Sequence, residues 1–356
     1  MYAPPNNIPL ARKNLKNLVL IYVESLEGAY ALNEVVNKNL LSPLTNLEKR
    51  PGTFSFSEFK QMSGTGWTIA GIVSSQCGIP LKTLSLFDGN KQGEHVTSFL
   101  PNATCLGDIL SENGYKNVFL RGASMEFAGA DIFLETHGYT ETYGREHWIE
   151  RGYHEHHLNN WGLYDYDLFY EARLKLNSLM QGNDRFNLTL LTVDMHPPHG
   201  FLSKECGRKG FKKFEGIVEC TALQIANFIS FIEDNGWSDD IQVVVMGDHL
   251  AFGGGPLNDK YDIVDSKRSI FNLFVSNDGN LANARNSITH FDMFPTILEF
   301  IGFDVPKGRF GLGYSALSND SNIDNDAYLK DLEIAVSGVG ETYKALWLTN
   351  LEKNNP

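Results

Sequence analysis

Acidic and imidazole side chains follow three separate apolar segments of this sequence. Glu24 ends the first segment, and Asp194 and His196 follow the second. Asp248 and His249 follow the third. Carboxylate oxygens and an imidazole nitrogen form a mixed ligand set that suits Mn²⁺, Mg²⁺ or Zn²⁺. The sequence therefore predicts a metal site made of Glu24, Asp248 and His249, although each residue alone is more typical of a helix N-cap or a polar loop.

A glycine-rich motif, GTGWTIAG from Gly64 to Gly71, supplies a candidate hydroxyl nucleophile. The motif leads into an Ile- and Val-containing segment that we expect to begin a helix near Thr68. The free N–H groups and positive dipole end of a helix start favour a bound phosphate. A hydroxyl placed there beside a metal can lose its proton and attack phosphorus. The motif does not distinguish Thr65 from Thr68, and a plain Thr N-cap is the simpler alternative.

Apolar runs of strand length alternate along the chain with longer segments of helical period. This alternation predicts an α/β fold with a mainly parallel central sheet and helices on both faces. Ligands of such sheets bind at the carboxyl ends of the strands, where the acids and imidazoles lie. The expected strands are 17–24, 116–120, 186–193, 241–246 and 270–275, and the expected helices are 104–113, 165–180, 214–233 and 290–301.

The composition is that of a folded globular protein and argues against a nucleic-acid partner. The 356 residues are 42% hydrophobic and carry a net charge of −13, whereas phosphate backbones are bound by clustered Lys and Arg. No run approaches the roughly 20 apolar residues needed to cross a bilayer, and residues 1–9 lack the apolar core of a signal peptide. We interpret residues 1–16 as a linker stub, 17–317 as the main domain and 318–356 as an extension that packs on it.

The four cysteines contain no C-x-x-C pair, which disfavours a structural zinc site. Cys206 and Cys220 flank a polar, Gly- and Lys-rich segment. Such a segment suits a disulfide that closes a surface loop and contributes about 3 kcal/mol in the loop-entropy model. A Cys77–Cys105 pair is also compatible with the sequence. Four buried free thiols are the alternative, because spacing alone does not separate the two states.

Three further features carry less weight. The segment His154-Glu155-His156-His157 has the composition of a metal cluster, but an exposed loop near the cleft is the simpler interpretation. The run 253–255 of three glycines lacks the following Lys-Ser/Thr of a nucleotide loop and predicts a turn beside the site. Sugar rings could stack on a group of aromatic side chains, although core or rim positions are commoner for such residues: Trp148, Tyr153, Trp161, Tyr164 and Tyr166.

Four segments, taken in order, resemble the phosphoglycerol transferases, which are sulfatase-like members of the alkaline phosphatase superfamily. The segments are NLVLIYVESLE, GTGWTIAGIVSSQCGIPL, LTVDMHPPHG and VVVMGDH, with WGLYD from Trp161 and HFDMFPT from His290 as later elements. The likeness is greatest to the bacterial enzymes that decorate osmoregulated periplasmic glucans, and lipoteichoic acid synthases are more distant. The resemblance extends over roughly residues 17–315 and implies that the domain 17–317 is a sulfatase/alkaline-phosphatase-like catalytic domain.

The resemblance also implies roles for individual residues. One divalent cation would be bound, Mn²⁺ in the first place with Mg²⁺ or Zn²⁺ as alternatives. Its implied ligands are Glu24, Thr68, Asp248 and His249. Thr68 would be the nucleophile, and His196 would contact the substrate phosphate or the leaving oxygen. Further substrate contacts are expected from Arg121, His199 and Trp67.

The family pattern is incomplete in two respects. The Trp and Arg that hold the glycerol phosphate headgroup in lipoteichoic acid synthases correspond to Ala128 and Ala130 here. Headgroup binding must therefore differ, and a lipoteichoic acid product is disfavoured. The N-terminal membrane helices common in the family are also missing, which implies a soluble domain that acts at the periplasmic face of the inner membrane.

The activity implied by the resemblance is transfer of sn-glycerol 1-phosphate from phosphatidylglycerol to a periplasmic glucan, through a covalent intermediate on Thr68. Two alternative activities belong to the same superfamily. One is hydrolysis of a phosphodiester, phosphonate or sulfate ester, and the other is polymerisation of the lipoteichoic acid type. A catalytically silent module that binds glycan or lipid is the non-enzymatic alternative, and failure to bind Mn²⁺ would favour it.

Overall fold

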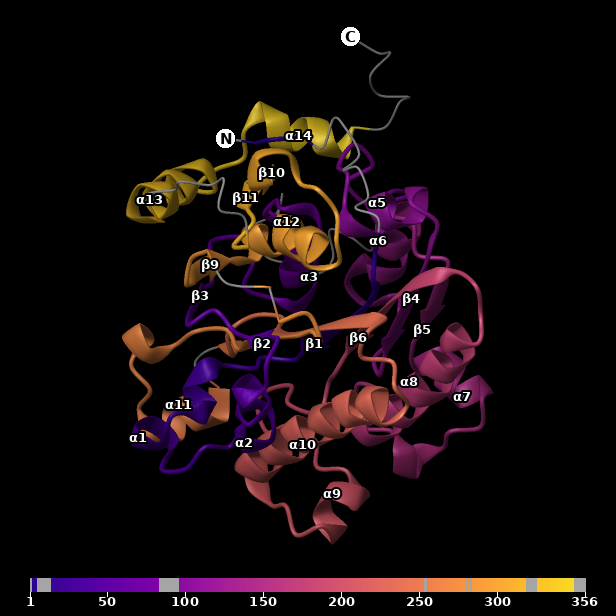
Figure 1. Ribbon diagram of the computed structural model, residues 1–356. Helices are drawn as coiled ribbons and strands as arrows, with labels where there is room; N and C mark the ends of the chain where they lie inside the picture. Colours follow the sequence, from indigo (N-terminus) through magenta and orange to yellow (C-terminus); the bar gives the residue numbers. More distant parts are fainter. Residues whose placement is uncertain are drawn as a thin grey trace.

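The computed structural model describes residues 2–4, 14–82, 96–252, 255–279, 281, 284–317 and 325–348. Within these ranges the strands form a central seven-stranded sheet in the order β2-β8-β7-β1-β6-β4-β5 (Figure 1). Its strands are β1 Asn17–Val23, β2 Thr53–Phe54, β4 Tyr115–Arg121, β5 Glu141–Tyr143, β6 Arg185–Leu191, β7 Ile241–Gly247 and β8 Asn272–Val275. Two-stranded pairs lie outside it: β3 Glu58–Lys60 with β9 Ser287–Thr289, and β10 Arg309–Phe310 with β11 Gly313–Tyr314.

The central sheet is mainly parallel, which confirms the prediction. Strands β7, β1, β6, β4 and β5 pair in parallel. Strand β8 runs antiparallel to β7, and β2 runs antiparallel to β8. The five parallel strands therefore bring their carboxyl ends to one edge of the sheet.

Strand β1 shows why the sheet must be covered on both faces. Alternate side chains Leu18, Leu20 and Tyr22 lie in one apolar cluster, whereas Val19, Ile21 and Val23 lie in the other. A strand that is apolar at every position is stable only between two layers of helices. The first layer contains α3 Thr68–Cys77, α5 Leu106–Glu112, α6 Ala130–Thr136 and α12 His290–Phe300. The second contains α2 Ser42–Thr45, α8 Asp165–Met180 and α10 Lys213–Asp234.

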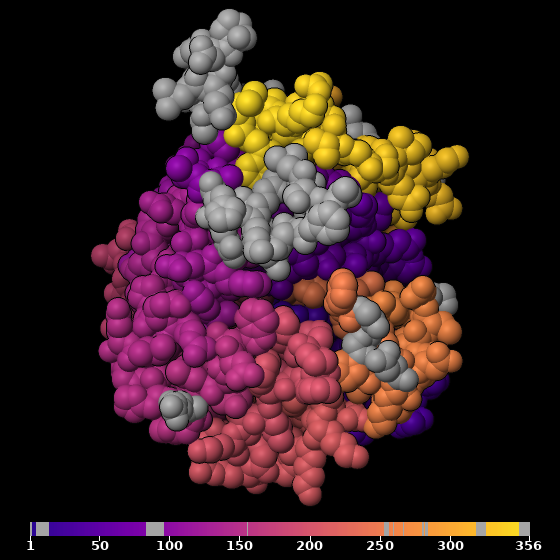
Figure 2. All heavy atoms as spheres, turned by 180° about the vertical axis from the view of Figure 1, so that it is seen from behind, coloured from indigo at the N-terminus to yellow at the C-terminus, as the bar shows by residue number. Residues whose placement is uncertain are grey.

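Shorter helices complete the described part of the chain. They are α1 Asn33–Val36, α7 Arg145–Glu150, α9 Lys204–Arg208 and α11 Gly255–Tyr261. Helices α13 Asn325–Ala335 and α14 Glu341–Trp347 lie across one end of the molecule (yellow in Figure 2). Tyr328 and Leu332 of α13 pack with Phe291 of α12. Most of residues 1–16, parts of 318–356 and residues 253–254 lie outside the described ranges.

Element boundaries differ from the sequence prediction by up to two residues where backbone N–H groups donate to partners outside the sheet. The strand predicted over 186–193 ends at Leu191, because the Asp165 carboxylate accepts the N–H groups of Val193 and Asp194. The strand predicted over 270–275 begins at Asn272, because the N–H of Ile270 donates to Phe59 O instead. Helix α8 has the predicted bounds.

Both cysteine pairs are disulfides, so the alternative of four free thiols is wrong. Cys77 at the end of α3 is bonded to Cys105, which caps the start of α5. Cys206 of α9 is bonded to Cys220 of α10. The first bond therefore joins two helices of one layer. The second joins the short helix α9 to α10.

Helix α10 is the one helix, among the described residues, that is long and apolar enough to cross a membrane. Its most apolar stretch is 67% buried within the protein. This burial is typical of the core helix of a globular domain.

Candidate active site

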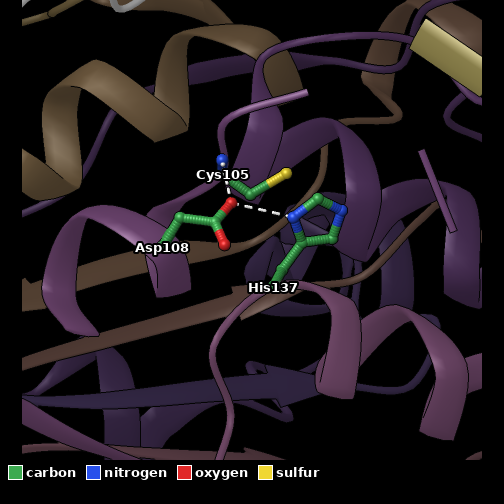
Figure 3. Close-up of side chains that lie close together, drawn as sticks. All are labelled: Cys105, Asp108 and His137. Carbon is green, nitrogen blue, oxygen red and sulfur yellow. Dashed lines mark hydrogen bonds and ion pairs between the residues drawn. The ribbon is translucent and has the colours of Figure 1, made fainter. Parts of the chain in front are cut away.

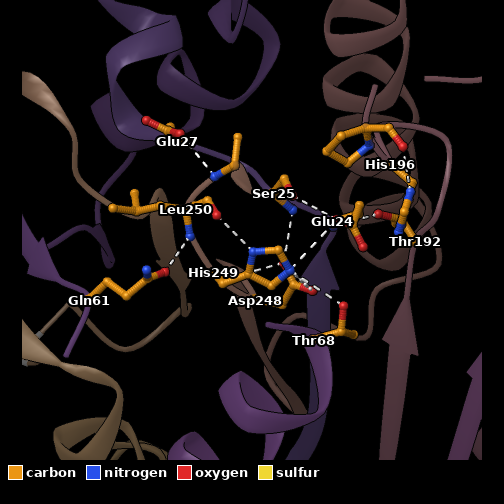
Figure 4. Close-up of polar contacts among 12 residues, drawn as sticks. Glu24, Ser25, Glu27, Gln61, Thr68, Thr192, His196, Asp248, His249 and Leu250 are labelled. Carbon is orange, nitrogen blue, oxygen red and sulfur yellow. Dashed lines mark hydrogen bonds and ion pairs between the residues drawn. The ribbon is translucent and has the colours of Figure 1, made fainter. Parts of the chain in front are cut away.

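Three neighbouring strands deliver polar side chains to one point at the carboxyl edge of the sheet (Figure 4). The register pairs Val23 of β1 with Gly247 of β7, so Glu24 and Asp248 leave the sheet side by side. On the other flank of β1, the N–H of Glu24 donates to Thr192 Oγ1 at 3.1 Å, just after β6 ends. Parallel pairing thus converts three distant sequence segments into one cluster.

Glu24, Asp248 and His249 form a compact and buried donor set. His249 Nε2 lies 3.4 Å from Asp248 Oδ2 and 3.7 Å from Glu24 Oε1. One ligand atom of each residue lies within 4.8 Å of the others. Their exposed fractions are 3%, 0% and 5% in sequence order. Two carboxylates this close together are costly to bury at this depth.

Hydrogen bonds orient the three donors toward a common point. Asp248 Oδ1 accepts the N–H groups of Ser25 (2.8 Å) and His249 (2.9 Å), whereas Asp248 Oδ2 has no hydrogen-bond partner among the described residues. His249 Nδ1 lies 2.8 Å from Leu250 O, so it carries the proton and Nε2 keeps its lone pair. An orphaned buried oxygen beside a free imidazole lone pair fits a divalent cation.

The electrostatics of the cluster also favour a cation. Burial, together with the Glu24 carboxylate, raises the pKa of Asp248 to about 6. Burial by itself lowers the pKa of His249, but Asp248 and Glu24 outweigh it and raise that pKa above its ordinary value. Both shifts show an excess of buried negative charge, which a bound cation would neutralise.

Thr68 is the first residue of α3 and faces this donor set. Its Oγ1 lies 3.4 Å from His249 Nε2. Trp67, not Thr68, is the N-cap residue, so the simple N-cap interpretation of Thr68 is wrong. Thr65 is occupied locally, because its Oγ1 accepts the N–H of Met62 and donates to Met62 O. The geometry therefore separates the two threonines that the motif left open.

Close packing fixes α3 against the loop that carries Asp248. A Cβ added to Gly71 would lie 2.0 Å from Asp248 O, so only glycine allows this approach. The same carbonyl accepts a hydrogen bond of 2.7 Å from His290 Nε2. Burial lowers the pKa of His290 to about 3, which keeps the ring neutral with its proton on Nε2. The HFDMFPT segment thus holds the backbone behind the site.

His196 lies beside the donor set in the loop after β6. Its Nδ1 donates to Pro197 O at 2.8 Å, so its Nε2 is unprotonated in the neutral ring. Burial lowers the pKa of His196, although the Pro197 carbonyl opposes this. The Trp161 ring packs against the imidazole with centroids 4.3 Å apart. Neutral His196 can therefore accept a proton or a hydrogen bond at Nε2.

A cavity opens beside Thr68 and His196. Its walls are mostly apolar and include Ile69, Ile72, Phe127, Ala128, Trp161, Leu191 and Val193. Arg121, from the end of β4, lines it as well and is 4% exposed. Burial lowers the pKa of Arg121 to about 10, against the attraction of Glu146, Asp131 and Glu24. Arg121 is therefore still a cation at neutral pH, and its Nε has no partner among the described residues.

Not every residue predicted for the site lies in it. His199 is exposed and is not among the residues that line the cavity. Trp67 caps α3 and packs against the apolar cluster instead. Ala128 lines the cavity, whereas Ala130 is buried at the start of α6.

Thr192 and Phe127 also lie at the site, although no sequence motif indicates them. Thr192 lies two residues before Asp194, between two apolar residues. This sequence context gives no sign of the hydrogen bond that it accepts from the Glu24 N–H. Phe127 packs edge-on against Trp161 and belongs to the irregular segment after β4. The positions of both follow from loop geometry that no periodic pattern reveals.

A second cluster of potential metal ligands is held together by a disulfide and by hydrogen bonds (Figure 3). Cys105, Asp108 and His137 lie close together, but the Cys105 sulfur is in a disulfide. His137 Nδ1 contacts Asp108 Oδ2 at 2.8 Å, and Nε2 contacts Phe99 O at 2.9 Å. Both ring nitrogens face oxygen acceptors, so neither lone pair is available for a metal.

The histidine-rich segment is also engaged in local contacts. His157 Nδ1 lies 2.9 Å from Asp167 Oδ2, and the rings of His156 and His157 are in contact. His154 and His156 are exposed. These contacts are compatible with the simpler interpretation of this segment as an exposed loop.

Comparisons with known proteins identify the family of this chain. The family model for sulfatases matches residues 16–303. The chain is 40% identical over 318 residues to phosphoglycerol transferase I of Escherichia coli O6:K15:H31, which covers 86% of this chain and 39% of that protein. The chain therefore spans about two fifths of the length of the curated relatives it matches.

Solved structures show the same fold at low sequence identity. LtaP, the lipoteichoic acid synthase of Listeria monocytogenes, has a TM-score of 0.63 at 18% identity, covering 88% of this chain and 78% of that one. The phosphoglycerol transferase GacH of Streptococcus pyogenes, in complex with sn-glycerol-1-phosphate, has a TM-score of 0.55 at 13% identity, covering 94% and 85%. The family model and the 40% identical relative confirm the resemblance inferred from the sequence motifs, and the chain belongs to the sulfatase family.

Proposed function

We propose that this domain is a metal-dependent phosphoglycerol transferase, which moves sn-glycerol 1-phosphate from phosphatidylglycerol to a periplasmic glucan through Thr68. The observation that carries the proposal is the Thr68 hydroxyl at the start of α3, 3.4 Å from a buried donor set with an orphaned carboxylate oxygen. The 40% identity to phosphoglycerol transferase I supports this choice among the activities of the family.

Four side chains would hold one divalent cation: Glu24, Thr68, Asp248 and His249. Mn²⁺ is our first choice, with Mg²⁺ or Zn²⁺ as alternatives, because the set mixes carboxylate oxygens with one imidazole nitrogen. When bound, the cation would acidify the Thr68 hydroxyl and neutralise charge on the phosphoryl group. This site would then need no further buried cation to balance its two carboxylates.

In the first step, Thr68 Oγ attacks the phosphorus of phosphatidylglycerol. A new Oγ–P bond forms as the bond between phosphorus and the diacylglycerol oxygen breaks. The proton lost by Thr68 is balanced by the proton that diacylglycerol gains as it leaves. The free N–H groups in the first turn of α3 donate to the phosphoryl oxygens. His196 Nε2 takes up the proton that Thr68 loses and donates it to the leaving diacylglycerol oxygen.

In the second step, a sugar hydroxyl of the glucan attacks the glycerophospho-threonine. Neutral His196 accepts the hydroxyl proton at Nε2, because its Nδ1 is held by Pro197 O. The bond between phosphorus and Thr68 Oγ breaks, and Thr68 regains a proton from His196, which is neutral again. One phosphoglycerol group has then moved from lipid to glucan.

Arg121 and the cavity beside Thr68 would hold the glycerol headgroup. The small Ala128 side chain leaves room there, and the Arg121 guanidinium can donate two parallel hydrogen bonds to a diol or an ester oxygen. The apolar walls formed by Ile69 and Phe127 would exclude water from the intermediate. This arrangement replaces the headgroup contacts that alanines at 128 and 130 cannot make.

The two disulfides support action outside the cytosol, because such bonds persist in oxidising compartments. We therefore assign the domain to the periplasmic face of the inner membrane, where phosphatidylglycerol and glucan are both within reach.

The test is intact-protein mass spectrometry after incubation with phosphatidylglycerol micelles and Mn²⁺, without acceptor. Wild type and Thr65→Ala should gain one glycerophosphate, whereas Thr68→Ala should not, and a chelator should abolish the gain. Thr65→Ala is the matched control because it removes a hydroxyl three residues away that does not face the donor set. Free glycerol phosphate without an adduct would indicate a hydrolase. In a second sample that contains an acceptor, repeated additions to one acceptor molecule would indicate a polymerase. No metal binding and no turnover would leave a binding module.

A further inference from the structure

Helix α3 carries the nucleophile of the proposed reaction, yet apolar packing alone does not fix its position along its axis. Its residues from Ile69 to Cys77 are all buried. Apolar contacts are non-directional, so a small axial shift would cost them little. Hydrogen bonds depend steeply on distance and angle, and a buried hydrogen bond between α3 and the sheet can therefore set this position.

Such a bond joins Tyr22 of β1 to Ser75 of α3. The two hydroxyl oxygens are 2.7 Å apart, and both residues are fully buried. Ser75 Oγ also lies 2.7 Å from Gly71 O, which can only accept, so the single Ser75 proton is directed there. Tyr22 must then donate to Ser75. In this hydrogen bond the strand β1 supplies the donor and the helix α3 supplies the acceptor.

Both ends of this link lie close to the site. Tyr22 precedes Glu24 by two residues in the same strand, and Ser75 follows Thr68 by seven residues in α3. Seven residues are about two turns, so Ser75 and Thr68 point to the same side of the helix. A slip of α3 by one residue would move Ser75 by about 1.5 Å and break the bond. Gly71 lies between them, and a Cβ added there would be 2.0 Å from Asp248 O.

We infer that Tyr22 is a positioning residue, which holds Thr68 at reacting distance from Glu24, Asp248 and His249 through its bond to Ser75. The inference rests on the proposed function, because it takes Thr68 to be the nucleophile. Tyr22 itself is not among the residues that line the cavity, and it acts through the placement of α3.

Tyr115 supplies a matched control. It lies in β4, belongs to the same apolar cluster as Tyr22, and donates a hydrogen bond of 2.7 Å from its hydroxyl to Lys16 O. Tyr115→Phe therefore removes a largely buried hydroxyl of the same kind, with its hydrogen bond, away from α3. Ser75→Ala removes the other end of the link and is the milder variant if Tyr22→Phe folds poorly.

The experiment compares kcat, KM, the Mn²⁺ dissociation constant and the rate of adduct formation on Thr68 in these variants. We expect Tyr22→Phe and Ser75→Ala to lower kcat and the adduct rate by about 10- to 100-fold, with KM changed less than about twofold. Mn²⁺ affinity should fall as well, because Thr68 is one of the proposed ligands. The double variant should be no worse than either single variant, because both remove one link. Tyr115→Phe should keep kcat within about twofold even if its melting temperature falls equally.

Equal losses of kcat in Tyr22→Phe and Tyr115→Phe would overturn the inference. Crystal structures of wild type and Tyr22→Phe add a readout that does not depend on the reaction. The separation of Thr68 Oγ1 from His249 Nε2, 3.4 Å here, should change by about 1 Å or more in the variant. An unchanged separation would overturn the inference, whereas absence of an adduct in wild type would overturn only the proposed function.

Discussion

The two carboxylate oxygens of Asp248 have different surroundings. One oxygen accepts two backbone N–H groups, and the other has no partner among the described residues although it is fully buried. This division keeps the side chain in place while one oxygen faces His249 and Glu24. A residue held in this way can be tested by removing its charge and keeping its shape.

Asp248→Asn should weaken Mn²⁺ binding by at least about 100-fold, because a neutral amide replaces the carboxylate that faces the cation. The metal-free protein should not lose stability, since the change removes one of two repelling buried carboxylates. Titration calorimetry with Mn²⁺ and thermal unfolding of the metal-free form measure the two effects. Asp240→Asn, an exposed change just before the same strand, is the control and should alter neither.

His196 should set the acid limb of the transfer step. Because burial lowers its pKa below the ordinary value of about 6.5, the ring stays neutral at neutral pH and can accept a proton. The rate at which a preformed Thr68 adduct passes to glucan should stay flat as pH falls to 6.5 and decline only below it. A rate already halved at or above that pH would contradict this role, and His196→Gln should reduce the rate about 100-fold or more.

Among the elements, helix α3 depends on one glycine contact that leaves no room for a larger side chain. Gly71→Ala would place a methyl group 2.0 Å from Asp248 O, so backbone must shift. We expect a loss of about 1–3 kcal/mol in unfolding free energy, together with weaker metal binding. Urea unfolding and Mn²⁺ titration measure both.

Gly207→Ala is the matched control for Gly71→Ala. Gly207 also lies within a helix, α9, but its nearest neighbour to a new Cβ is 4.0 Å away, at the end of the Leu202 side chain. The gain in helix propensity should then leave stability equal or slightly higher. Equal losses in the two variants would show that helical glycine as such, rather than the approach to Asp248, explains the effect.

The long elements were predictable because their pattern repeats many times. Helix α8 has the predicted bounds, and α10 differs from the prediction by one residue at each end. Strands of two to four residues, such as β2 and β5, are too short to show a period. The antiparallel direction of β8 was equally hidden, because direction depends on the partner strand and not on the residues of the strand itself.

The site was predictable where residue type and strand end coincide. Glu24, Asp248 and His249 lie together because parallel strands end at one edge. Loop residues behaved differently: the same segment after β6 turns His196 into the cavity and leaves His199 exposed. Their orientation depends on turns and side-chain caps, such as the hydrogen bonds that the Val193 and Asp194 N–H groups donate to the Asp165 carboxylate.

At the scale of the whole molecule, the two disulfides should affect stability alike and activity differently. Cys77–Cys105 closes a separation of 28 residues, and Cys206–Cys220 one of 14. The loop-entropy model gives about 3–4 kcal/mol for the first and about 3 kcal/mol for the second. Double Cys→Ser variants should thus both melt at lower temperature.

Only the Cys77/Cys105 double variant should also lower kcat, because only that bond ends on α3. Differential scanning calorimetry and steady-state kinetics on both double variants provide the comparison. If the Cys206/Cys220 variant lost as much kcat, the effect would reflect general loosening rather than the anchoring of α3.

The central place of β1 in the sheet has a consequence for amide hydrogen exchange. With three strands on each side of it, the N–H groups of residues 18–23 can meet solvent only when the sheet as a whole opens. Peeling of the edge strands β2 or β5 would leave Glu24 beside Asp248. The metal-binding geometry and the global fold should therefore be lost in one cooperative event, and chelation should not by itself create a partly unfolded state at β1.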